Sequence, residues 1–180
     1  RLIAAHVRSV AAALQYIERE VAATRIRENG EIRTEATGNI VAATYRHDVS
    51  REGEPDLHTH GVIANITRSA DGQWRSLESR LLYRLQTDAG AVYRAALARE
   101  SERLGYAIER TQAGDHPSFE LRAVSQAERE MWSTRSRQVE AELAKMGLTR
   151  ATATAEQKQA AALATRQSKS NIDRGNLLST

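Results

Sequence analysis

The sequence predicts an α+β protein in which an antiparallel sheet is flanked by helices. Three observations support this class. Apolar residues recur every three or four positions in two long segments, near the start of the chain and again from about residue 81, as on one face of a helix. Alternating segments rich in β-branched residues, joined by turn residues, lie between them. The strand and helix spacing of parallel β-α-β units is absent, so the strands are expected to pair as hairpins.

The first element is a predicted helix at residues 2–23. Its apolar residues are spaced by three and four and so mark one helix face: Leu2, Ile3, Val7, Val10, Leu14, Ile17 and Val21. His6 and Tyr16 lie on the same helix, where we expect packing or surface roles. Asn29-Gly30 follows between two alternating segments. Because both central residues of the tightest hairpin turn need a positive φ, this pair predicts a hairpin.

A second pair of strands is predicted at residues 39–47 and 57–67, which alternate in polarity. The polar segment between them contains Pro55 and is expected to be a loop. An Asp-Gly turn at 71–72 then leads into a further short strand at 73–77. These segments supply most of the predicted sheet.

The apolar spacing of a helix returns at residues 81–104, and Gly105 is a plausible residue to end that helix. Residues 106–110 and 118–124 flank a polar loop and predict two short strands. The helix and the strands after it complete the α+β pattern.

Two capping signals predict helices in the last third of the chain. Ser125 and Glu128 form a capping box that opens a helix reaching about Met146. Thr154, with a Gln three residues later, predicts a cap before a polar helix at 155–169.

Composition limits the possible chemistry. The chain has no Cys, so a metal ion would need His, Asp or Glu ligands. The 26 basic residues include 23 Arg, and the net charge is +3. Arginine suits phosphate and stacks on bases, which favours a nucleic-acid partner, although a GC-rich genome would give the same bias. No apolar run is long enough for a membrane span, and no leader segment is recognisable, so a cytoplasmic location is expected.

Three of the five histidines lie within 14 residues of one another: His47, His58 and His60. In an extended strand residues i and i+2 share a face, so His58 and His60 can point to one ion. If the strand that ends at His47 pairs with theirs, the third imidazole lies nearby on the same face. Three His ligands leave coordination positions open for substrate, as in catalytic metal sites. The alternative is a half-buried strand with two chance histidines.

Several segments together closely resemble the conjugative relaxases of the TrwC/TraI-like (MobF) group, which belong to the HUH endonuclease superfamily. The resemblance covers most of the chain and lies in residues 39–51, 55–60, 62–65, 69–74, 82–84, 90–94, 104–106 and 133–135. It implies an antiparallel palm of the HUH or rolling-circle type. It also implies a bacterial, metal-dependent enzyme that nicks and rejoins single-stranded DNA at a plasmid transfer origin, together with other relaxosome proteins.

The resemblance implies particular roles. His47, His58 and His60 would hold a divalent ion (Mg, Mn or Zn) on the scissile phosphate. A tyrosine hydroxyl would attack phosphorus and form a 5′-phosphotyrosine with release of a 3′-hydroxyl. The family's nucleophilic tyrosines lie ahead of the matched segment, so we expect the nucleophile upstream and no catalytic tyrosine in this chain. Residues 1–150 would be the histidine-bearing part of the catalytic domain, and 151–180 a polar helical extension or linker.

DNA contacts are also expected by resemblance and by residue type. Arg51 matches a position near the DNA backbone and would clamp a phosphate. Arg94 and Arg99 would read bases, and Arg25 and Arg27 would follow the DNA strand. Trp74, like Tyr83, would stack on a base. The expected DNA-binding residues are therefore Arg25, Arg27, Arg51, Trp74, Arg94 and Arg99. Each is equally consistent with a surface or packing residue.

Two other functions remain open. The alternative to the relaxase is a catalytically inactive single-stranded DNA-binding module with a structural or vestigial three-His site. A three-His metallohydrolase of another fold is the third possibility, although no general base is apparent for it.

Overall fold

A computed structural model describes residues 1–113 and 116–166 of the chain. These residues form α-helices and short antiparallel strand pairs, so the predicted α+β class is confirmed. The chain divides into two compact units. The first comprises Arg1–Arg46 and Thr59–Ala123, and the second comprises His47–His58 and Val124–Thr180. No helix in the described ranges is long and apolar enough to cross a bilayer.

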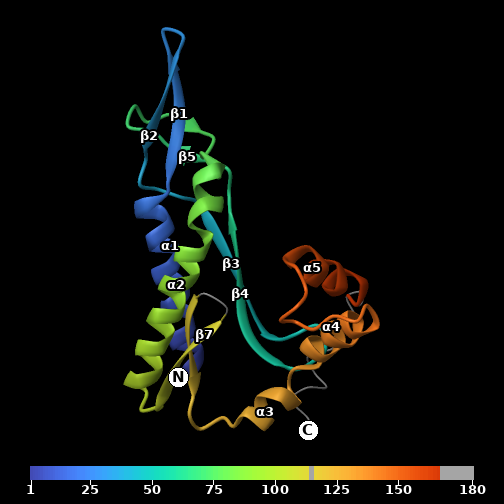
Figure 1. The fold of residues 1–180 in the computed structure, drawn as a ribbon. Helices are drawn as coiled ribbons and strands as arrows, with labels where there is room; N and C mark the ends of the chain where they lie inside the picture. The colour runs from blue at the N-terminus through green and yellow to red at the C-terminus, as the bar shows by residue number, and fades with distance from the viewer. Residues whose placement is uncertain (114–115, 167–180) are drawn as a thin grey trace. The chain divides into compact units, whose positions relative to one another are not determined.

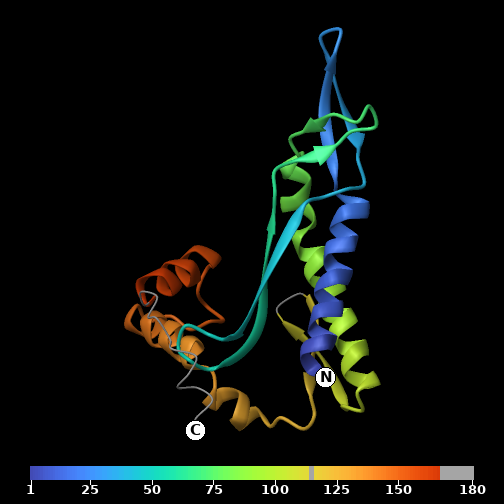
Figure 2. The same cartoon turned by 180° about the vertical axis from the view of Figure 1, so that it is seen from behind.

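The first unit is organised around two long helices that lie side by side, α1 (Leu2–Glu20) and α2 (Ser79–Arg103), as Figures 1 and 2 show from opposite directions. An apolar helix face is normally the buried one. On α1, however, the buried residues are small or polar, namely Ala5, His6 and Ser9. The first part of the apolar face is largely exposed, with Val7 at 50%. The predicted helix is therefore confirmed, but its most buried face is not its most apolar one.

The first hairpin follows α1 directly. Strands β1 (Ala23–Glu28) and β2 (Glu31–Ala36) pair antiparallel across Asn29 and Gly30, whose φ angles are +52° and +86°. These angles confirm the turn that the sequence predicts. The helix ends three residues before the predicted position because Ala23 is buried at the start of β1.

Strands β3 (Ala42–Val49) and β4 (Pro55–Ile63) form a second two-stranded ladder. The predicted loop between them is shorter than expected. Its turn is closed by a 2.8 Å hydrogen bond from the Ser50 N–H to the Glu54 carbonyl. Pro55 begins β4, a position where the missing N–H of proline is tolerated.

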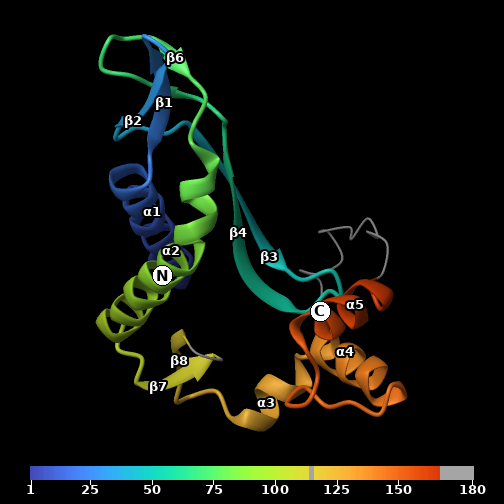
Figure 3. The ribbon, with the colours of Figure 1, turned by 45° about the horizontal axis from the view of Figure 1, so that its top comes forward.

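Two further strand pairs complete the first unit. Strands β5 (Thr67–Arg68) and β6 (Trp74–Arg75) enclose the predicted Asp-Gly turn. Strands β7 (Ile108–Ala113) and β8 (His116–Leu121) pair antiparallel after the end of α2 (Figure 3). In the described residues the strands thus make four separate ladders rather than one continuous sheet.

The described residues of the second unit form three helices, α3 (Gln126–Met131), α4 (Thr134–Lys145) and α5 (Ala155–Ala164), and Figure 3 shows α4 and α5 next to each other. Both predicted capping boxes are present, at Ser125 and Thr154. Helices α4 and α5 share an aliphatic core that consists of Val139, Leu143, Ala153 and Ala161.

The prediction of one helix from Ser125 to Met146 is wrong, because the chain leaves helical geometry at Trp132 and Ser133. The Ser133 hydroxyl donates to the Arg129 carbonyl at 2.5 Å, which closes the end of α3 with a side chain. The Arg137 guanidinium donates to the Glu130 carbonyl there as well. The predicted last helix ends at Ala164, and positions 167–169 lie outside the described residues.

Candidate metal centre and nucleic-acid interface

His47 of β3 and His58 of β4 lie next to each other in the second unit. Their ring centroids are 5.3 Å apart and the ring planes differ by 15°. The strand pairing therefore brings two imidazoles from separate sequence segments together, as the spacing predicted. Both side chains are half-buried.

The His58 ring is oriented by Asp56. Its Nδ1 lies 2.9 Å from the Asp56 carbonyl oxygen and 3.3 Å from the Asp56 carboxylate. A carbonyl oxygen only accepts hydrogen bonds, so Nδ1 must carry the hydrogen. In the neutral ring Nε2 then keeps its lone pair. Metal-ligating histidines are commonly held in this way by a carbonyl or carboxylate on the other nitrogen. The donor chemistry of this pair therefore fits a divalent ion.

His60 follows His58 by two residues in β4, belongs to the first unit and is exposed. Because successive side chains of a strand alternate between its two faces, His58 and His60 project from the same face of β4. Across residues 1–113 and 116–166, no group of three or more His, Asp or Glu side chains is arranged to hold a metal ion. The geometry thus supports the His47–His58 pair, while the three-membered site stays a prediction.

The turn between these two histidines is attached to α4. The Glu54 carboxylate accepts a 3.0 Å hydrogen bond from the Thr134 N–H, in the first turn of that helix. A carboxylate at a helix N-terminus satisfies an otherwise unpaired N–H and interacts favourably with the helix dipole. The contact fixes the turn within the second unit.

A further histidine, His6, is buried and contacts β4. His6 of α1 is 2% exposed, and its ring nitrogens contact two hydroxyls. Nδ1 lies 2.8 Å from the Tyr93 hydroxyl of α2, and Nε2 lies 2.7 Å from the Thr59 hydroxyl of β4. The sequence predicts a packing or surface role for His6. No local signal identifies the contact, because its partners are 53 and 87 residues away.

The arginines predicted to contact DNA have different surroundings. Arg25 forms a 2.8 Å ion pair with Glu78, whose side chain is only 6% exposed. Glu78 also accepts from Arg80 at 2.7 Å. The Arg80 hydrogen bond, then the charges of Arg80 and Arg25, lower the pKa of Glu78 to about 2. Arg25 therefore has a structural role in joining β1 to α2.

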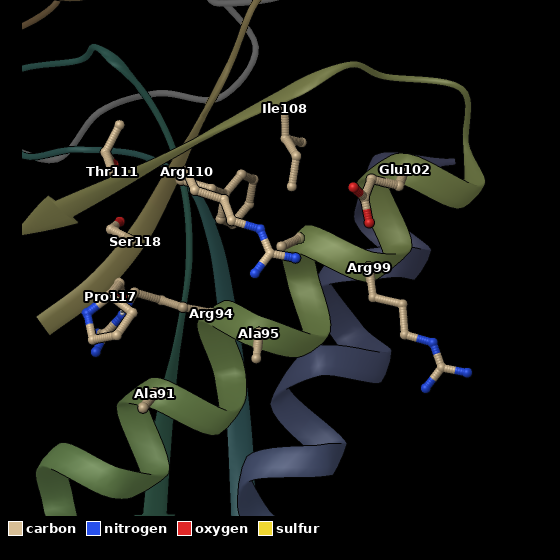
Figure 4. Close-up of a pocket in the computed structure, with 12 residues that line it drawn as sticks. Ala91, Arg94, Ala95, Arg99, Glu102, Ile108, Arg110, Thr111, Pro117 and Ser118 are labelled. Carbon is tan, nitrogen blue, oxygen red and sulfur yellow. Dashed lines mark hydrogen bonds between the residues drawn. The ribbon is translucent and has the colours of Figure 1, made fainter.

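Arg94 and Arg99 border a cavity of about 240 Å³ between α2 and the β7–β8 hairpin (Figure 4). Arg94 donates to the Pro117 carbonyl at 2.9 Å. In Figure 4, Arg110 extends from β7 toward α2, whereas Arg99 points away from the cavity. Arg94 and Arg110 lie against the cavity, whereas Arg99 extends away from it.

The remaining predicted contacts lie at accessible positions. Arg27 is exposed on β1, and Arg51 is exposed in the turn between β3 and β4. The Trp74 side chain of β6 is 58% exposed and Tyr83 of α2 is 74% exposed. Base stacking requires such accessible rings, so both aromatics remain candidates.

The comparison with known proteins identifies the family. The family model described as TrwC relaxase matches residues 1–180. The chain belongs to the TrwC relaxase family. This confirms the resemblance seen in the sequence. The multifunctional conjugation protein TraI of Escherichia coli strain K12 is 35% identical over 182 residues, which cover 96% of this chain and 10% of that protein.

Solved TrwC relaxase structures have the same fold as this chain. A metal-free complex of the conjugative relaxase TrwC with OriT DNA superposes with a TM-score of 0.90 at 39% identity, covering 98% of this chain and 61% of that one. A metal-bound TrwC–OriT complex also gives 0.90 at 39% identity, covering 97% and 59%. The chain thus spans about a tenth of the curated relatives' length and about three fifths of the solved TrwC chains.

Proposed function

We propose that this chain is the histidine-bearing part of a relaxase that nicks and rejoins one DNA strand at a plasmid transfer origin. The observation that carries the proposal is the 39% identity, at a TM-score of 0.90, to TrwC complexes that contain OriT DNA. The pairing of His47 with His58 supports it independently, because it supplies nitrogen donors of the kind this chemistry needs.

In this proposal His47, His58 and His60 hold a divalent ion. When bound, such an ion neutralises charge on the non-bridging oxygens of the scissile phosphate. His58 contributes Nε2, because Asp56 engages its Nδ1. Glu54 and α4 hold the turn that joins the two strands. A solved TrwC relaxase with metal bound supports an ion of this class, with Mg, Mn and Zn as the expected alternatives.

The proposed reaction exchanges one phosphoester for another. A tyrosine oxygen forms a bond to phosphorus, the bond from phosphorus to the 3′ oxygen breaks, and the leaving oxygen takes a proton. Rejoining reverses these steps. We assign no nucleophilic role to the tyrosines of this chain. Tyr45 is exposed on β3 two residues before His47, and we assign it to packing or base stacking.

DNA recognition in this proposal uses phosphate contacts and stacking. Arg51 and Arg27 contact phosphates, Arg99 reaches bases, and Trp74 stacks on one. Arg25 and Arg94 act mainly by positioning β1 and the β7–β8 hairpin, because Arg25 pairs with Glu78 and Arg94 donates to the Pro117 carbonyl. The expected partners are origin DNA and other relaxosome proteins, in the bacterial cytoplasm.

The proposed domain division places the histidine-bearing part at residues 1–150 and an extension at 151–180. The described portion of the extension contains α5, whose Ala161 shares a core with Leu143 of α4. The segment up to Ala164 therefore packs as part of the second unit. The division at 150 remains a prediction about function rather than packing.

The test uses the protein expressed from its full reading frame, with single-stranded origin DNA and Mn²⁺ or Mg²⁺. The wild type should form a covalent protein–DNA adduct that survives denaturing electrophoresis. His58→Ala should reduce adduct formation by about 100-fold or more, because the charge on the phosphate is no longer neutralised. His116→Ala changes an exposed histidine of β8 and is the matched control.

A catalytically inactive DNA-binding module is the second candidate. Its three-His site would be structural or vestigial, and the exposed rings of Trp74 and Tyr83 would serve it as well as the enzyme, because base stacking needs no metal. A wild type that binds origin DNA tightly but forms no adduct with either metal would support this candidate and refute the enzyme.

A further inference from the structure

His6 connects three elements of the first unit through two short hydrogen bonds. It projects from α1, and its two ring nitrogens contact the Tyr93 hydroxyl of α2 and the Thr59 hydroxyl of β4 at 2.8 and 2.7 Å. The His6 and Tyr93 rings also meet edge to face, with centroids 5.6 Å apart and planes at 82°. With both nitrogens and one ring edge in contact, the imidazole has a single defined orientation.

Thr59 is the residue between His58 and His60. Successive side chains of a strand point to opposite faces, so the Thr59 hydroxyl faces away from the side on which the two histidines project. A hydrogen bond at Thr59 therefore holds β4 from the face opposite to the one on which His58 and His60 project.

We propose that His6 is a positioning residue for the metal centre: it holds Thr59, and with it the part of β4 that carries His60, against the α1–α2 pair. The inference rests on the proposed function, because it assigns His6 a role in a site whose metal is itself proposed. His6 does not contact the ion or the DNA in this proposal. Its effect passes through the strand backbone.

The surroundings of His6 fit this role. Ala5 and Ser9, which flank it on the buried face of α1, are both fully buried, and the Ser9 hydroxyl donates to the Ala5 carbonyl of its own helix. Small residues at these positions let α1 approach closely. Further along the same helix, a Cβ on Gly61 of β4 would lie 3.9 Å from the Leu14 side chain. β4 therefore runs close to α1 beyond Thr59 as well.

A polar link suits this task better than an apolar contact. Apolar burial is non-directional and tolerates sliding, whereas a hydrogen bond weakens steeply when its angle or length changes. Metal ligands must meet their ion within a few tenths of an ångström. Loss of the link should therefore reduce metal affinity more than it reduces overall stability.

The central variant is Thr59→Val, which keeps the shape of the side chain and removes its hydroxyl. We expect it to weaken Mn²⁺ binding by about 3–10-fold, below the 10–100-fold found for groups bonded directly to a ligand. Thr59→Ser keeps the hydroxyl and should bind Mn²⁺ within twofold of wild type. Ser9→Ala, which removes a buried hydroxyl from α1, the helix that carries His6, is the control and should also stay within twofold.

The measurement is calorimetric titration of the metal-free protein, expressed from its full reading frame, with Mn²⁺. Melting temperatures of the metal-free variants are recorded in parallel. His6→Gln should weaken Mn²⁺ binding as Thr59→Val does, and the double variant should be no weaker than the worse single variant, because both changes remove the same link.

Three results have different meanings for the two proposals. If the wild type binds none of Mn²⁺, Mg²⁺ and Zn²⁺, the proposed function fails. If the wild type binds Mn²⁺ and both Thr59→Val and His6→Gln bind it within twofold of wild type, the proposed function stands and the positioning role of His6 is refuted. Equal losses of Mn²⁺ affinity in Thr59→Ser and Thr59→Val would also refute it, because the hydroxyl would then be irrelevant.

Discussion

The helix pairs α1–α2 and α4–α5 are held together by different kinds of contact. Between α1 and α2 lie a histidine bridged to a hydroxyl, and an Arg8–Glu100 ion pair at 2.5 Å. Between α4 and α5 the main contact is an aliphatic core with Leu143 fully buried, to which Arg135 adds hydrogen bonds to the Ala162 and Thr165 carbonyls. Directional contacts fix the relative position of the elements they join, whereas apolar burial mainly adds stability. The α1–α2 pair is also bonded to β4, through His6 and Thr59.

The largest effect is expected when the aliphatic core of the α4–α5 pair is disrupted. Leu143→Ala leaves a cavity in the α4–α5 core and should destabilise this pair by about 2–5 kcal/mol. Hydrogen exchange of the α4 amides, followed by mass spectrometry, measures the loss. Leu163→Ala removes a side chain that is 59% exposed on the neighbouring helix and should change the same exchange by less than about 0.5 kcal/mol. Equal effects would mean that the aliphatic core is not what joins these helices.

The next largest effect is expected when the hydrogen bond between α1 and α2 is removed. Tyr93→Phe keeps the ring and removes the hydroxyl that His6 contacts, so it should cost about 1–3 kcal/mol of stability in the first unit. Exchange of the α1 amides is the measurement. Tyr83→Phe, on the same helix but 74% exposed, is the matched control and should be close to neutral. A neutral Tyr93→Phe would show that α1 and α2 do not depend on this directional contact.

A smaller effect should appear in the pH dependence. Glu78 precedes α2, and its pKa is lowered to about 2 from the ordinary 4.5, chiefly by the Arg80 hydrogen bond and then by the Arg80 and Arg25 charges. A carboxylate with a lowered folded-state pKa stabilises the protein above its unfolded-state pKa, and this contribution is lost as pH falls from about 5 toward 2.

Glu78→Gln should therefore flatten the decline in melting temperature of the first unit between pH 5 and 2. Glu156→Gln, at an exposed position of α5, is the comparison and should leave the decline as it is in wild type. An unchanged slope for Glu78→Gln would show that the ion pairs at the start of α2 contribute no stability.

The smallest effect on stability is expected from an exposed ion pair beside helix α4. Arg150 and Glu140 form a 2.7 Å ion pair in which both side chains are about half exposed. Exposed pairs contribute 0 to about 1 kcal/mol, so Arg150→Ala should change α4 exchange very little. Raising the salt concentration should remove what difference remains. A loss comparable with that of Leu143→Ala would contradict the distinction between the two helix pairs.

Much of the fold was predictable because its signals are local. The Asn29-Gly30 turn and both capping boxes depend on side chains within four residues of the backbone groups they satisfy. The break at Trp132 was missed for a related reason. A Ser133 hydroxyl that closes the preceding turn competes with helix continuation, and apolar spacing does not reveal that competition.

The candidate site divides in the same way. The spacing of His58 and His60 placed them on one strand side, and the family resemblance assigned their role. The adjacency of His47 to His58 required strand pairing, which the structure supplies. The importance of His6 was invisible in the sequence, where a histidine on an amphipathic helix most often packs or faces solvent.

The sequence by itself determined most elements of this protein, its family and the donor atoms available to a metal. Only the tertiary structure decided which face of α1 is buried and which residues hold β4. The physical reason is distance along the chain. Turns and caps are satisfied by neighbouring residues, whereas the contacts of His6 join residues 53 and 87 positions apart, and only the packing of α1, α2 and β4 brings them together.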